Sequence, residues 1–181
     1  GAALVLMSTV LLAAAHRHTD LSLVLPASRA GMLVVLPIAA YLTIGEMVDG
    51  MGRAAIAVMV VGVAILPLQS LRSADLGRYA RALGAPATRH ALLAGAVAAG
   101  YTIWDKRSVQ VLSPITYLAA LSVILGIVYV LVLQQTERRA VMLEWRKAWT
   151  RILLVAVLGI GSSYLALVAL QTENASYVVA L

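Results

Sequence analysis

Apolar residues along the chain gather in long runs that are separated by short polar segments. A helix needs about 20 apolar residues to cross a bilayer core of about 30 Å. Within each run the apolar residues form no one-sided stripe, as expected for a helix surrounded by lipid and other helices. The runs also lack the alternation of apolar and polar residues, over about ten residues, that a transmembrane strand shows. The pattern predicts an all-α membrane protein, a polytopic helical bundle. Six runs meet or approach this length and a seventh begins, at 1–15, 21–45, 54–71, about 90–104, about 111–133, about 148–170 and 175–181.

Composition excludes several classes of protein. The chain is 62% apolar and 12% charged, whereas soluble domains are about 45–50% apolar and about 25% charged. A soluble enzyme or a nucleic-acid-binding domain could not hide this much apolar surface. The absence of cysteine excludes disulfides and thiolate metal sites. We therefore expect a lipid bilayer as a partner, and no nucleic acid.

The basic residues are unevenly distributed between the loops. The first, third and fifth loops hold ten Lys or Arg, and the other three loops hold Arg53, Lys106 and Arg107. Basic loops tend to stay in the cytoplasm, which favours the odd loops inside. The ten are Arg17, Arg72, Arg78, Arg81, Arg89, Arg138, Arg139, Arg146, Lys147 and Arg151.

A faint internal repeat relates residues 11–24 to residues 165–178. A shift of 154 residues superposes Asp20 on Asn174 and Ser22 on Ser176. The two copies lie five spans apart, an odd number, so they must cross the membrane in opposite senses. This spacing predicts an inverted-topology repeat, which many secondary transporters contain.

Five short motifs resemble the drug/metabolite transporter superfamily, EamA type. The resemblance implies two inverted five-helix halves and the export of small metabolites, including amino acids. It implies that residues 1–75 are the C-terminal part of the first repeat, 76–89 a basic linker, and 90–181 the N-terminal part of the second. The chain would then be part of a longer protein. The motifs are Pro26-Ala-Ser-Arg29, Leu42-Thr-Ile-Gly45-Glu46, Ala98-Ala-Gly-Tyr-Thr-Ile-Trp104-Asp-Lys106, Ser113-Pro-Ile-Thr-Tyr117, and Ser162-Ser-Tyr164 continuing to Leu170 before Ala175-Ser-Tyr-Val-Val179.

Membrane orientation stays open at this point. Members of this family usually begin in the cytoplasm, which would place the basic third and fifth loops outside, opposite to the Lys/Arg count. The inverted relation between the two halves is the same in either orientation.

Arg29 is the first candidate for a substrate-binding residue. It lies eight residues into an apolar run, about 12 Å along the helix. A charge at this depth costs at least about 2.5 kcal/mol, so it should face a polar cavity or a partner. A guanidinium suits a substrate carboxylate, although snorkelling to the interface is the structural alternative. Pro26 in the same run frees a backbone carbonyl and is a candidate cavity or pivot residue.

Aromatic residues near the ends of spans are the other candidates for substrate binding. Tyr101 and Trp104 end a short, small-residue-rich run, and Tyr164 brings a hydroxyl into the sixth run. Interfacial anchoring and helix-to-helix hydrogen bonds are the alternatives. Gly45 and Glu46, the Gly-Glu pair, are either a gate or a structural helix end. Asp105 and Lys106 are expected in a loop.

The chemistry of an enzyme is missing from the sequence. The histidines His16, His18 and His90 lie at span edges, and there is no metalloprotease or nucleophile motif. We therefore predict no enzyme, no cofactor and no metal site. The prediction is a multi-pass secondary transporter of the inner (plasma) membrane, an exporter of amino acids or related carboxylates by alternating access. The alternatives are a non-transporting scaffold or a channel-like facilitator, and a homodimer is left open.

Overall fold

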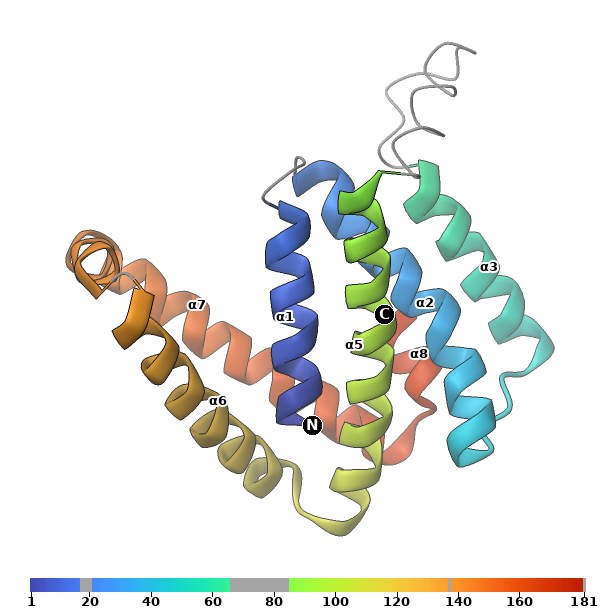
Figure 1. Cartoon of the computed structure of the whole chain (residues 1–181). Helices are drawn as coiled ribbons and strands as arrows, with labels where there is room; N and C mark the ends of the chain where they lie inside the picture. Colours follow the sequence, from blue (N-terminus) through green and yellow to red (C-terminus); the bar gives the residue numbers. More distant parts are fainter. Residues whose placement is uncertain (17–20, 66–84, 137, 181) are drawn as a thin grey trace. The chain divides into compact units, whose positions relative to one another are not determined.

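The computed structural model describes residues 1–16, 21–65, 85–136 and 138–180 (Figure 1). All regular structure in these ranges is helical, which confirms the predicted all-α class. Seven helices occur in them: α1 (Ala2–His16), α2 (Leu21–Ile44), α3 (Gly50–Ile65), α5 (Pro86–Val111), α6 (Pro114–Thr136), α7 (Arg138–Thr172) and α8 (Ala175–Ala180).

Some predicted features lie outside the described residues. These are the basic residues of the third loop before Arg89, most of the linker at 76–89, the end of the third predicted span with Pro67, and the residues Arg17, His18 and Leu181.

Three of the described helices are long and apolar enough to cross a membrane. They contain the candidate spans Val24–Ile44, Pro114–Val132 and Trp145–Thr172, and two shorter apolar segments lie at Ala2–His16 and Gly50–Val63. These helices identify a multi-pass membrane protein.

The fourth predicted span is wrong in its length and its end. The helix α5 has 26 residues and continues through Val111, so Asp105 and Lys106 lie within a helix and not in a loop. The Lys106 side chain is only 8% exposed. The charged residues suggested a loop. No proline interrupts this stretch before Pro114, which disfavours helix at the preceding residue, Ser113.

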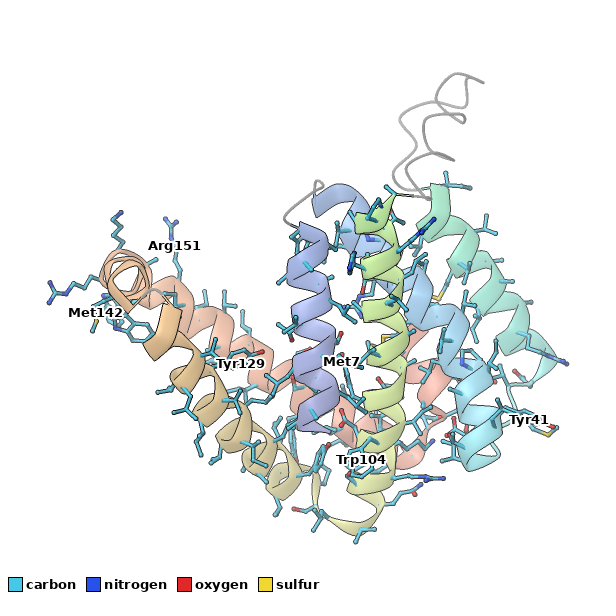
Figure 2. The ribbon with its side chains drawn as sticks, viewed as in Figure 1. Met7, Tyr41, Trp104, Tyr129, Met142 and Arg151 are labelled. Atoms are coloured by element: carbon cyan, nitrogen blue, oxygen red, sulfur yellow. The ribbon has the colours of Figure 1, made fainter. Side chains whose placement is uncertain are left out.

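The basic fifth loop is also helical. Residues from Arg138 onward form the first part of α7, and the non-helical backbone of Ala148 (φ −132°, ψ 20°) separates this basic part from the apolar part that follows. Arg, Lys, Glu, Leu and Met all favour helix, so the charges there do not mark a break in secondary structure. Figure 2 shows Arg151 and Met142 on either side of this kink.

The chain divides into two compact units, one formed by residues 3–105 with 173–181 and the other by residues 106–172. In the second unit α6 packs against α7. The Gln171 side-chain amide donates a hydrogen bond to the carbonyl of Val109 (2.8 Å). This bond ties the end of α7 to the end of α5.

One buried cluster in the first unit consists mainly of small residues. Ala15, Val24, Ala27 and Ala91 are buried together, with Leu12 packed against them. They come from α1, α2 and α5, and short side chains allow helix backbones to approach closely.

The helices α2 and α5 touch through their backbones. A Cβ atom added at Gly95 would overlap the carbonyl oxygen of Ser28, and one added at Gly31 would lie 2.6 Å from the carbonyl oxygen of Leu92. Glycine is therefore required on both sides of this crossing. The Ser8 hydroxyl donates to the carbonyl of Ala94 (3.0 Å) and joins α1 to α5, and Figure 1 shows these two helices side by side.

Candidate functional site

Arg29 lies on α2, inside the candidate span Val24–Ile44, and its side chain is exposed on the described surface. Pro26 lies within the same helix and is partly buried. A proline has no N–H, so Pro26 cannot donate the helical hydrogen bond to the carbonyl of Ser22. The N-terminal third of α2 therefore combines a fixed positive charge with a weakened backbone ladder.

The crossing of α2 and α5 brings two predicted site residues together. The charges of Asp105, one turn further along α5, and of Arg29 on α2 both act on the Tyr101 hydroxyl. Tyr101 is partly buried. Trp104 lies on the same helix with 54% of its side chain exposed, near the end of α5 in Figure 2. The sequence had assigned Asp105 to a loop, so its membership in this group was missed.

Tyr164 stays a prediction as a substrate-binding residue. It lies on α7, in the unit formed by residues 106–172, and its side chain is 40% exposed.

The Gly-Glu pair ends α2 with a left-handed cap. Gly45 has φ +69°, and its N–H donates to the carbonyl of Tyr41 (3.2 Å), as in an αL C-cap. The next residue, Glu46, accepts a hydrogen bond at Oε2 from the N–H of Ala175 (3.0 Å). A carboxylate at the start of α8 satisfies one of the free amides of that helix. The pair therefore connects α2 to a segment 129 residues away.

Asp49 makes a second connection to the start of α8. Its Oδ1 accepts hydrogen bonds from the Tyr177 hydroxyl (2.6 Å) and from the Gly52 N–H (2.7 Å). The N–H of Asp49 donates in turn to the Tyr177 oxygen (3.3 Å). The two hydrogen bonds to the carboxylate, the one from Tyr177 first, lower the pKa of Asp49 from its ordinary value. The Gly52 contact was readable from the sequence, because an Asp immediately before a helix commonly caps its first turn. The Tyr177 contact was not.

Gly52 leaves the room that the Tyr177 ring occupies. A Cβ atom at Gly52 would lie 2.5 Å from Cε1 and 2.6 Å from the hydroxyl oxygen of Tyr177. Both distances are shorter than those of real Cβ contacts, so a side chain at this position would have to displace the Tyr177 ring.

Ser176 lies between the two anchoring residues of α8 and is 1% exposed. Its hydroxyl has no hydrogen-bond partner among the described residues. Burying such a group without a partner costs about 1–3 kcal/mol. Nothing in the helical pattern of the sequence signals this hydroxyl, because serine is common in membrane helices.

A pocket of about 400 Å³ opens at the C-terminal end of α2. Its walls are mainly apolar, with one acidic and one basic side chain, and Figure 2 shows Tyr41 at this end of the helix. The lining residues are Pro37, Ile38, Tyr41, Glu46, Met47, Val48 and Arg53.

Within the described ranges, no group of three or more His, Asp or Glu side chains is arranged to hold a metal ion. His16 ends α1, while its predicted neighbour His18 lies outside the described residues.

Long apolar helices, a cation within one of them and glycine-packed crossings together define a polytopic membrane protein built from closely packed helices. The EamA-like transporter family model matches residues 90–181, more than half of the chain. The chain belongs to this family, which is part of the drug/metabolite transporter superfamily. Its members are transporters and generally not enzymes. No curated protein and no solved structure matches the chain.

Proposed function

We propose that the protein is a secondary transporter that exports small carboxylate-bearing metabolites, amino acids or related compounds, across the inner (plasma) membrane. It works by alternating access between two inverted halves, without a cofactor. The observation that carries the substrate class is the group formed by Arg29, Tyr101 and Asp105.

The three side chains suit the two charges of a zwitterion. A guanidinium binds a carboxylate through two parallel hydrogen bonds, and a carboxylate binds an ammonium group. A tyrosine hydroxyl both donates and accepts hydrogen bonds. Asp105 and Arg29 come from different helices and their charges both act on Tyr101, which supports a site that takes the two charges of an amino acid.

The bounds of the helices support the inverted repeat. The helix α2 begins at Leu21 and α8 begins at Ala175, which is the same offset of 154 residues that relates the two sequence segments. The preceding helices α1 and α7 end at His16 and Thr172, within two residues of that offset. Substrate sites at the interface of such repeats are common in secondary transporters.

The test is solute flux in proteoliposomes that contain the full-length protein. A panel of amino acids and small carboxylates is loaded, with and without a pH gradient. We expect Arg29→Ala to raise KM for a transported carboxylate about 10–100-fold, the effect of losing a charge-assisted hydrogen bond. Arg29→Lys should retain part of the activity, because it keeps the charge and loses the planar fork.

Arg89→Ala is the matched control, since Arg89 is an exposed arginine in the first turn of α5. Its KM should stay at the wild-type value. Equal KM values for Arg29→Ala and the wild type would remove Arg29 from the site. A folded protein without flux of any solute on the panel would contradict transport and favour a scaffold.

A further inference from the structure

Hydrogen bonds join the start of α8 to the connection between α2 and α3, where Glu46 accepts from the Ala175 N–H and Asp49 pairs with Tyr177. We call these residues the latch: Glu46, Asp49, Tyr177 and Gly52, whose N–H donates to Asp49. Glu46 binds the first amide of α8, and Asp49 exchanges hydrogen bonds with Tyr177. Asp49 is exposed and Glu46 and Tyr177 are partly exposed. Water can replace each partner in such contacts, so breaking them costs little.

The crossing of α2 with α5 is of a different kind. There the backbones of the two helices meet at Gly31 and Gly95, with no room for one added carbon atom. Contacts of this sort are close-packed and do not slide or open by small steps. Within the first unit, α8 is therefore easier to move relative to α2 than α5 is.

Ser176 indicates what the movement changes. Its hydroxyl is buried and without a partner among the described residues, while its two neighbours in sequence, Ala175 and Tyr177, carry the latch contacts. A buried hydroxyl that lacks a partner favours any conformation in which water or a ligand reaches it. One unsatisfied buried group therefore lies between the two contacts that hold the start of α8.

We propose that the latch is a gate of the transport path, closed in this structure, and that its opening exposes Ser176 to the path. The gate rests on the proposed transport function, but its opening is measurable without transport. Tyr177 and Gly52 are its positioning residues. The hydroxyl of Tyr177 holds the gate, and Gly52 leaves the space in which the ring lies.

The first experiment measures the rate at which a membrane-impermeant thiol reagent labels Ser176→Cys. The 181 residues contain no cysteine, and any cysteine elsewhere in the full-length protein is replaced by serine. We expect Tyr177→Phe to raise the labelling rate about fivefold, as expected for the loss of one hydrogen bond. Gly52→Ala should raise it at least as much, because it displaces the ring.

Each test substitution has a control that makes the same chemical change away from the latch contacts. Gly50→Ala adds a methyl group where nothing lies within 4 Å, and Tyr129→Phe removes a hydroxyl on α6, far along the chain from the latch. Both should leave the labelling rate of Ser176→Cys at its starting value. Equal rates in all four variants would overturn the gate.

The second experiment links the gate to transport. In the double variant Asp49→Cys, Tyr177→Cys, the two thiols are joined by a short bifunctional reagent that is cleaved by reduction. Flux should stop when the latch is cross-linked and return on reduction, and flux that continues through a locked latch would overturn the gate. If labelling responds to Tyr177→Phe and no solute is transported, the movement stands and the proposed function fails. If solutes are transported and labelling never responds, the function stands and the gate fails.

Discussion

The carboxylate of Asp49 is stabilised in its charged form by two donors. The Tyr177 hydroxyl and the Gly52 N–H both point to Oδ1, at 2.6 Å and 2.7 Å. A hydrogen bond donated to the ionised form lowers a carboxyl pKa, and the pKa of Asp49 is lowered accordingly. These contacts therefore stabilise the folded state above the pKa of the unfolded chain, and this stabilisation is lost as the pH falls through the lowered value.

At this scale we predict that Tyr177→Phe raises the pKa of Asp49 toward its ordinary value of 3.8. The largest cause of the lowered pKa, the hydrogen bond from Tyr177, disappears, while the Gly52 N–H remains. A carbon NMR titration of the Asp49 carboxyl group measures the change. Tyr129→Phe should leave this pKa where it is. An unchanged pKa in Tyr177→Phe would show that the hydroxyl does not bind the carboxylate in solution.

At the level of secondary-structure elements, two glycines allow α2 and α5 to cross closely, because glycine has no side chain. Gly31 and Gly95 face the backbone of the other helix, and the alanines Ala27 and Ala91 are buried beside them. Lipid is as apolar as a helix surface, so close van der Waals packing stabilises helix association in a membrane. This contact also holds Arg29 near Tyr101, and its geometry matters for the proposed site.

We predict that Gly95→Ala destabilises the protein by about 1–3 kcal/mol, the usual cost of overpacking. The added carbon overlaps the Ser28 carbonyl, and a backbone atom cannot rotate away. Gly126→Ala on α6 is the control, because nothing lies within 4 Å of its added carbon and alanine favours helix over glycine by up to about 1 kcal/mol. Thermal unfolding of the purified protein compares the two, and the shifts should have opposite signs. Equal midpoints would mean that the backbones do not meet at Gly95.

For the whole molecule, the question is which helices cross the membrane. The helix α5 is not among the long apolar candidates, yet its 26 residues extend about 39 Å at 1.5 Å per residue. Its charges lie near the two ends, with Arg89 on one side and Asp105, Lys106 and Arg107 on the other. The middle is apolar and rich in alanine and glycine. This distribution suits a helix that spans about 30 Å of hydrocarbon with its charges near the two interfaces.

We predict that the two ends of α5 lie on opposite sides of the membrane. Two single variants, Ala85→Cys and Leu112→Cys, carry the new cysteine at positions that flank α5. Each is labelled with an impermeant thiol reagent in intact cells. One position should react and the other should react only after the cells are opened. The Lys/Arg count favours Leu112 outside, and the family resemblance favours Ala85 outside. Labelling of both positions from the same side would mean that α5 does not cross.

The sequence alone determined the features that depend on neighbouring residues. The apolar run predicted at 21–45 is the helix Leu21–Ile44, and the apolar part of α7 starts after the kink at Ala148, where a span was predicted. Bilayer thickness sets the length of an apolar run that spans it, and the length and apolar character of a run depend only on neighbouring residues. Loops were predicted from the charged residues at the end of α5 and the start of α7. These predictions were wrong, because Lys, Arg and Glu are good helix formers.

Which side chains meet depends on how the helices assemble. Asp49 and Tyr177 are separated by 128 residues, and no periodicity in either segment indicates the other. The sequence does not distinguish Gly52 from other helical glycines, but in the structure the Tyr177 ring lies against it. Ser176 is buried on α8, a helix that packs against α2 and α3. Hydrophobic burial is non-directional and selects helices as a class. The choice of partners depends on close packing and directional hydrogen bonds, which exist only once the helices are assembled.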